Sequence, residues 1–184
     1  GQTTNFGAHT NDIAQWGLGM DGTTPVEFED NGSEFLPPGS MFDTAVKTAF
    51  RARYANGIEL ICRTEDPGFG VRFEGSDGWV EYFSGKTSSE PASLIDSVIG
   101  PDEIHLPVSG NHYRNFIDAV KSRQDPIEPV EVGHRTASLC HLGSIAMRLG
   151  RKIPWDPQTQ QCPGDEEAGA MLKRPYRQPW KLPG

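Results

Sequence analysis

Two β-hairpins near the middle of the chain are the strongest constraint on its fold. Residues 45–54 and 58–64 alternate apolar and polar side chains on either side of an Asn-Gly turn, and residues 70–74 and 79–83 do so around a glycine-bearing turn. Residues 30–41 are rich in glycine and proline, which predicts a surface loop. Because strands adjacent in sequence usually pair, we predict one open, mostly antiparallel sheet.

Helical segments follow these strands along the chain. Residues 132–149 carry a broad apolar stripe at helical spacing and end in Arg148 and Gly150, as a helix C-terminus does. Shorter helices are predicted over residues 8–18, 93–98, 111–122 and 165–172. The fold class predicted is therefore α+β, an open and mostly antiparallel β-sheet covered on one face by helices, with a Pro-rich tail over about residues 156–184.

Composition narrows the classes of partner. The chain has 184 residues, enough for one domain with a core, and its net charge of −8 argues against nucleic acid, leaving ligands that are neutral, cationic or bound locally. No apolar run approaches the ~20 residues of a membrane span. Cys62, Cys140 and Cys162 fit neither a disulfide framework nor a structural zinc site, so cysteine usage favours the cytoplasm.

The N-terminus predicts that this sequence is a piece of a longer protein. It opens at Gly1 and reaches a candidate functional motif within nine residues, without a leader. An upstream export signal in the parent therefore stays possible, and the compartment stays open.

His9 and Asp12 are the candidate chemical centre. Gly7 allows a tight turn before them, and a spacing of three residues at a helix start places imidazole and carboxylate on one face. That arrangement suits proton transfer or ligand binding. The alternative is that Asp12 is an ordinary first-turn carboxylate favoured by the helix dipole.

Other chemical signatures are weak or missing. His134 and His141 lie seven residues apart on the strongest helix and with His112 invite interpretation as a metal site, but no HExxH or comparable pattern is found. A metal-dependent hydrolase using His9 and Asp12 remains a minor alternative, and no metal ligand is assigned. The sequence has no GxGxxG, GxxxxGK[ST] or GxSxG motif, so no cofactor-binding residue is predicted in this chain.

Several motifs in a fixed order resemble the C-terminal half of the glucose-fructose oxidoreductase / inositol dehydrogenase (Gfo/Idh/MocA) family, most closely its bacterial predicted-dehydrogenase branch. The resemblance covers essentially the whole chain. It rests on the runs NFGAHTNDIAQW at 5–16, GMDG at 19–22, VRFEG at 71–75 with Gly78-Trp79, Asn115-Phe116 with VKSR at 120–123, EVGHR at 131–135, and RPYR at 174–177.

The resemblance implies a two-domain parent. Family members carry an N-terminal Rossmann domain that binds NAD or NADP and holds a catalytic lysine in a Glu-Lys-Pro motif. Their C-terminal domain, which is similar to that of dihydrodipicolinate reductase, contacts the substrate and often forms the oligomer interface. Residues 1–184 would then be the substrate-binding and oligomerisation domain, inactive alone. Its partners would be a carbohydrate-like substrate, the missing N-terminal domain and further copies bound through the sheet face.

The resemblance also implies roles for three residues. The family motif Asp-x-x-x-His places its histidine at His9, which exchanges a proton with the sugar or polyol hydroxyl, but the aspartate position is Asn5 here. An amide can hold a hydroxyl, yet it cannot raise the basicity of an adjacent imidazole as a carboxylate does. His9 and Asn5 are the predicted catalytic residues and Asp12 the predicted substrate-binding residue. A non-catalytic carbohydrate-binding or assembly module is the alternative that Asn5 supports.

Overall fold

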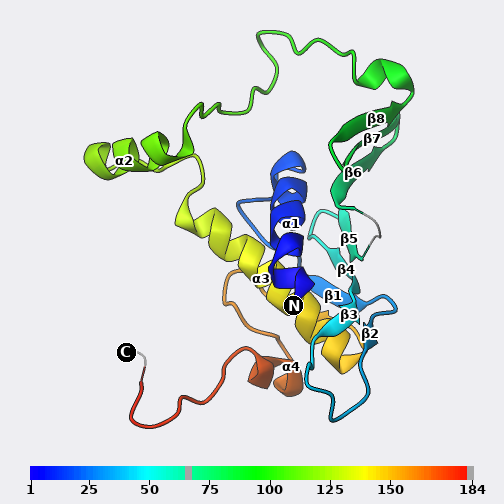
Figure 1. Ribbon diagram of the computed structural model, residues 1–184, viewed down its shortest axis with the longest axis vertical. Coiled ribbons are helices and arrows are strands. Elements are labelled where there is room, and N and C mark those ends of the chain that lie inside the picture. The colour runs from blue at the N-terminus through cyan, green and yellow to red at the C-terminus, as the bar shows by residue number, and fades with distance from the viewer. Residues whose placement is uncertain (65–67, 182–184) are drawn as a thin grey trace.

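The computed structural model describes residues 1–64 and 68–181 (Figure 1). Residues 182–184 of the predicted tail lie outside the described residues. The helices are α1 Phe6–Gly17, α2 His112–Ser122, α3 Val130–Leu149 and α4 Glu166–Met171, with 3-10 turns at Gln2–Thr4 and Ala92–Leu94. The strands are β1 Glu27–Asp30, β2 Glu34–Phe35, β3 Ala45–Lys47, β4 Ala49–Arg53, β5 Glu59–Arg63, β6 Gly70–Gly75, β7 Gly78–Phe83, β8 Lys86–Glu90 and β9 Ile153–Pro154. None of the helices described is long and apolar enough to cross a membrane.

The predicted mixture of helices and antiparallel strands is confirmed, but the described strands form three sheets instead of one. Their orders are β5-β4-β1-β9, β6-β7-β8 and β2-β3. The predicted strand 45–54 is divided at Thr48, whose amide donates to Thr64 Oγ1 at 2.9 Å. Before Thr48 the chain pairs as β3 with β2, and after it as β4 with β5 and β1. One continuous segment therefore serves two sheets.

Three strands lie where no strand was predicted. β2 falls inside the predicted loop 30–41, β8 has the polar sequence KTSSE, and β9 has only two residues. Each is paired by a neighbouring strand, as Ile153 of β9 is with Phe28 of β1. Conversely, the predicted helix 93–98 is only the 3-10 turn Ala92–Leu94.

The core lies between α3 and one face of the four-stranded sheet. Phe28, Phe50, Ala52 and Leu60 are buried there, while side chains between them in sequence, such as Arg51, face away from the core. Gly143 of α3 brings that helix close, because a Cβ at this position would lie 2.6 Å from the Phe50 ring. The sheet is thus covered on one face by α3, with α1 packed against α3 (Figure 1).

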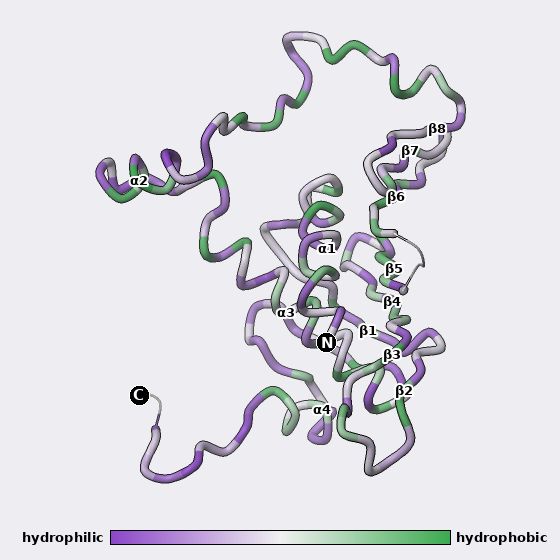
Figure 2. The backbone as a smooth tube through the Cα atoms, viewed as in Figure 1, coloured by the Kyte–Doolittle hydropathy of each residue, from purple (hydrophilic) through white to green (hydrophobic). Residues whose placement is uncertain are grey.

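Helix α2 does not cover the sheet as expected. It stands apart from the body of the protein, at the end of a long segment that arches from β8 (Figures 1 and 2). Its amphipathic spacing is as predicted, yet the apolar face is exposed at Tyr113, Phe116, Ile117 and Val120. Correct helix periodicity therefore identified the element but not its packing partner.

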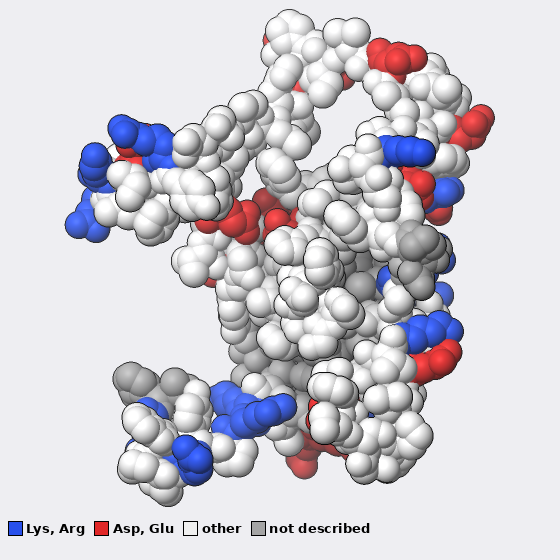
Figure 3. All heavy atoms as spheres, in the orientation of Figure 1, with Lys and Arg blue, Asp and Glu red and all other residues white. Residues whose placement is uncertain are grey.

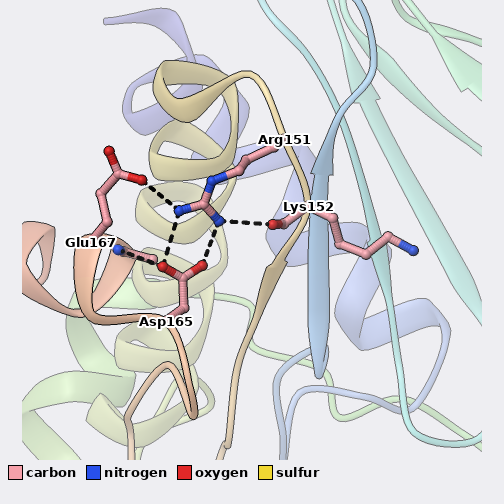
Figure 4. Close-up of polar contacts among 5 residues, drawn as sticks. Arg151, Lys152, Asp165 and Glu167 are labelled. Atoms are coloured by element: carbon pink, nitrogen blue, oxygen red, sulfur yellow. Dashed lines mark hydrogen bonds and ion pairs between the residues drawn. The ribbon is translucent and has the colours of Figure 1, made fainter.

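An ion-pair cluster joins the end of α3 to the start of α4 (Figure 4). Arg151 binds both carboxylate oxygens of Asp165, at 2.5 and 3.0 Å, and Glu167 at 2.7 Å. Asp165 Oδ1 also accepts the amide of Ala168 at 3.0 Å and so caps α4. Lys152 points away from the cluster and pairs with Glu27 of β1 at 2.8 Å. These contacts fix α4 and the adjoining β9 against the core.

Acid should weaken this cluster. The bonds from Arg151 and the Ala168 amide lower the pKa of Asp165 to about 2, whereas an unfolded aspartate titrates near 3.9. A lowered folded-state pKa stabilises the fold above about pH 4, and that stabilisation is lost as pH falls towards 2. We expect Asp165→Asn to destabilise the chain at pH 6 and to match wild type near pH 2 in urea unfolding series. The control is Glu166→Gln; a difference between wild type and Asp165→Asn that does not shrink in acid would contradict the expectation.

Candidate functional site

A cavity of about 390 Å³ lies between α1 and the N-terminal half of α3. Small and apolar side chains form much of its wall, and carboxylates and imidazoles supply its polar groups. The lining residues are Thr4, Ala8, His9, Asp12, Ile13, Glu128, Gly133, Thr136, Ala137, Cys140 and His141. Its volume is in the range of small-molecule sites.

The two residues of the predicted centre both line this cavity. His9 and Asp12 lie one turn apart in α1, with His9 exposed and Asp12 half-buried. Asn5 does not line it. Asn5 precedes α1 as an exposed N-cap residue whose side chain makes no capping bond. The structure therefore brings His9 and Asp12 to one site and leaves Asn5 at its margin.

A chain of buried hydrogen bonds ends at Asp12. The Tyr54 hydroxyl donates to Gln15 Oε1 at 3.1 Å, and Gln15 Nε2 donates to Thr136 Oγ1 at 2.8 Å. The Thr136 hydroxyl in turn donates to Asp12 Oδ1 at 2.8 Å. Tyr54, Gln15 and Thr136 are each at most 5% exposed. The Asp12 carboxylate is thereby held by Thr136 of the cavity wall and, through it, by Gln15 of α1 and by Tyr54, which directly follows β4.

Two thiols lie beside Asn11, the residue directly before Asp12 in α1. Asn11 Nδ2 donates to Cys140 Sγ at 3.4 Å and lies 3.8 Å from Cys62 Sγ. Burial raises the pKa of Cys140, and burial raises the pKa of Cys62 to about 12. Both thiols are protonated at neutral pH, so neither is a ready nucleophile, although Cys140 reaches the cavity.

The cavity is acidic. Partial desolvation, followed by repulsion from the Asp12 and Asp21 carboxylates, raises the pKa of Glu128. Neither Lys nor Arg is among the lining residues. Figure 3 shows acidic atoms gathered between α1 and the α2–α3 connection, whereas the basic atoms on this face lie elsewhere. Such a lining favours neutral or cationic groups over anions, in agreement with the net charge.

The remaining histidines do not assemble a metal site. His141 lines the cavity, whereas His134, seven residues earlier, borders a small depression beside Trp155. His112 lies on α2. Within residues 1–64 and 68–181, no three His, Cys, Asp or Glu side chains are placed to hold a metal ion. Among these described residues, the alternative of a metal-dependent hydrolase therefore has no group of metal ligands.

Sequence reasoning missed Thr136, Gln15, Tyr54 and Glu128. Only a weak signal for one of them was present: Asn11 and Gln15 lie four residues apart and share a face of α1 with Ala8 and Leu18, whereas the larger apolar residues Phe6, Ile13 and Trp16 lie on the opposite, exposed face. Polar side chains on a buried helix face need partners, and this predicts a hydrogen-bond network behind the site. The identity of those partners depends on the tertiary fold.

Comparison with known proteins bears on the family and the fold. The family model for the C-terminal alpha/beta domain of an oxidoreductase family, Gfo/Idh/MocA, matches residues 1–182. No curated protein matches the chain. Among solved structures, an aldose-aldose oxidoreductase from Caulobacter crescentus, complexed with glycerol, has a similar fold with a TM-score of 0.54 and 15% identity. The similarity covers 80% of this chain and 45% of that one, so the chain spans less than half the length of that oxidoreductase.

Proposed function

Because the chain belongs to the Gfo/Idh/MocA oxidoreductase family, as its C-terminal alpha/beta domain, we propose that it is the substrate-binding half of an NAD(P)-dependent oxidoreductase acting on a sugar or polyol hydroxyl. The observation that carries the proposal is the placing of His9 and Asp12 on the wall of one cavity. The similar fold of an aldose-aldose oxidoreductase supports the substrate class. This sequence has no glycine-rich phosphate-binding motif, so its residues do not fit the nucleotide, which an N-terminal domain would hold.

The residues of the cavity suit the proton side of alcohol oxidation. Oxidation of an alcohol to a carbonyl removes a proton from oxygen and a hydride from carbon, and NAD(P)⁺ supplies the hydride acceptor. His9 is exposed at the cavity and takes the hydroxyl proton as general base. Asp12 accepts a hydrogen bond from a substrate hydroxyl and so holds the ring or chain in place.

The cavity lining also suits a neutral carbohydrate. Ala8, Ile13 and Ala137 offer apolar contacts for C–H faces, while Asp12 and Glu128 accept bonds from hydroxyls. Two carboxylates without a lining Lys or Arg disfavour phosphorylated sugars and sugar acids on this wall. The proposal therefore names a sugar or polyol without an acidic group at this position.

Asn5 bears on the alternative of a non-catalytic carbohydrate-binding or assembly module. The alternative is supported by the presence of Asn5 where the family motif has aspartate. Since Asn5 does not line the cavity, the change leaves His9 and Asp12 in place there, and this favours the enzyme. Asn5 stays a proposed catalytic residue at the margin of the cavity, directly before α1.

Besides a substrate, the predicted partners are other polypeptides: the N-terminal domain and further copies of this chain. The exposed apolar face of α2, with Phe116 and Tyr113, supports a covering partner in the complete protein. The homo-oligomer through a sheet face stays a prediction. The N-terminal domain remains the partner that the family implies.

The test joins this chain to its N-terminal nucleotide-binding domain. NADH and NADPH are titrated by fluorescence, and neutral sugars, polyols and sugar acids are then assayed for oxidation. We expect one cofactor to bind and neutral substrates to react. If neither cofactor binds, the dehydrogenase proposal is wrong. Cofactor binding without turnover of any substrate would favour the carbohydrate-binding module.

A further inference from the structure

We propose that the hydrogen bonds from Tyr54 through Gln15 and Thr136 fix Asp12 as a pure hydrogen-bond acceptor, so that the cavity selects a hydroxyl over a carboxylate at this position. Thr136 is then a positioning residue of the site. The inference rests on the proposed function, because it concerns the same cavity and its carbohydrate ligand. The three bonds measure 3.1, 2.8 and 2.8 Å along the chain.

The direction of the bonds follows from the groups that make them. An ionised carboxylate has no proton to give, so the Thr136 hydroxyl must donate to Asp12. A hydroxyl has one proton, and Thr136 Oγ1 must therefore accept from Gln15. Only the Nε2 group of Gln15 can donate, which turns its Oε1 towards Tyr54. In the opposite amide orientation, the Thr136 hydroxyl would face two acceptors, Gln15 Oε1 and Asp12 Oδ1, with a single proton to donate.

Tyr54 anchors the far end of the chain. Gln15 Oε1 can only accept, so the phenol must donate to it. Burial raises the pKa of Tyr54, which keeps that proton in place at neutral pH. Tyr54 is 2% exposed and Gln15 0%, so water does not compete for these groups. Each of the three hydrogen bonds therefore donates in the direction of Asp12.

One Asp12 oxygen is left for a ligand. Thr136 occupies Oδ1, and the residues the structure describes place no hydrogen-bond donor on Oδ2. Asp12 is half-buried on the cavity wall. A hydroxyl or an ammonium group can donate to that oxygen, whereas a carboxylate meets another acceptor with the same charge. Fixing the rotamer beforehand also removes an ordering cost on binding.

Asp12→Asn should reverse the preference. The Thr136 hydroxyl would hold the carbonyl oxygen of the new amide, whose Nδ2 group would present donors to the cavity in place of an acceptor. The probes are sorbitol and gluconate, two six-carbon ligands that differ at one end, titrated into the labelled 184-residue chain by NMR. Wild type should bind sorbitol more tightly, and Asp12→Asn should lower the sorbitol-to-gluconate affinity ratio by roughly tenfold or more.

Glu128→Gln is the matched control for charge. It removes one carboxylate from the same cavity without touching the hydrogen-bond chain. We expect it to improve gluconate binding by loss of repulsion and to lower sorbitol affinity by a smaller factor than Asp12→Asn does, because the amide oxygen of the new side chain still accepts a bond from a hydroxyl. An equal loss of sorbitol affinity in both variants would show that charge alone sets the preference and would overturn the inference.

Thr136→Val and Thr136→Ser test the positioning role without a ligand. NMR couplings should report a single Asp12 χ1 rotamer in wild type and in the serine variant, and averaging in the valine variant. Tyr54→Phe removes the distant donor and provides a second variant if the valine protein does not fold. In a Thr136→Val background, Asp12→Asn should no longer reverse the preference, because the amide is free to turn.

The outcomes separate this inference from the proposed function. If sorbitol does not perturb Asp12 or His9 signals in wild type, the proposed carbohydrate site fails, while the rotamer measurement still decides the role of Thr136. If sorbitol binds but the Asp12 rotamer is unchanged in the Thr136→Val and Tyr54→Phe variants, the inference is wrong and the proposed function stands.

Discussion

Replacing His9 by Ala in the protein joined to its nucleotide-binding domain is expected to lower kcat by about 10²–10⁴-fold, the usual contribution of a general base. His9 is an exposed imidazole on the cavity wall, one turn from Asp12, and the residues lining that wall include no lysine or thiolate to replace it. Cofactor affinity should stay within about twofold, because the nucleotide lies on the other domain. Steady-state kinetics and a fluorescence titration give the two values.

Two further histidines test this assignment. His134→Ala is the matched control, since that imidazole borders a different depression on α3, and it should leave kcat within about twofold. His141 is the rival, because it lines the same cavity from the opposite helix. A large loss of kcat in His141→Ala, with little change in His9→Ala, would move the general base to α3 and contradict the family assignment.

The elements that sequence predicted well are those fixed by local chemistry. At the β4–β5 hairpin, Gly57 has a φ of +90°, which suits glycine, and Asn56 Oδ1 accepts the amide of Ile58 at 3.1 Å. The helix ending at Leu149 is followed by Gly150 with a φ of +62°. Such signals reside within a few residues and need no knowledge of the rest of the fold.

The elements that sequence did not predict depend on distant partners. Strand β8 is polar at every position and exists because it pairs with β7, from Trp79↔Glu90 to Phe83↔Lys86. The break at Thr48 is set by Thr64 and by Thr3, whose hydroxyl lies 3.0 Å from that of Thr48. No periodicity within residues 45–54 encodes either contact.

The candidate site shows the same division. His9 and Asp12 were found because a spacing of three residues brings two side chains to one face of a helix. The helix begins at Phe6, earlier than predicted, so Gly7 is helical and Asp12 is not a first-turn carboxylate. The residues that hold Asp12 are separated from their partners by 124, 121 and 39 positions along the chain. The sequence alone does not assign Gln15 to a buried face, because the large apolar side chains Phe6, Ile13 and Trp16 lie on the opposite side of α1. Only the packing of α1 against α3 shows that Gln15 is buried and that its partner is Thr136.

The largest effect on stability is expected from Phe50→Ala. Phe50 is fully buried on β4, lies 6.5 Å from the Phe28 ring by centroids, and packs beneath α3 at Gly143. Removing a buried phenylalanine ring leaves a cavity and costs roughly 3–5 kcal/mol of unfolding free energy. Urea denaturation of the 184-residue chain measures the loss. Phe42→Ala, at a position 66% exposed, is the control and should change stability by less than about 0.5 kcal/mol.

Gly143→Ala separates loss of packing from a general weakening of the chain. In wild type the new methyl group would lie 2.6 Å from the fully buried Phe50 ring, so we expect destabilisation by about 1–3 kcal/mol. With Phe50→Ala the ring is gone, and the same substitution should become neutral or stabilise by up to ~1 kcal/mol through helix propensity. The two effects must therefore couple by more than about 1 kcal/mol in a double-mutant cycle. Additive values would mean that α3 does not rest on β4 through this pair.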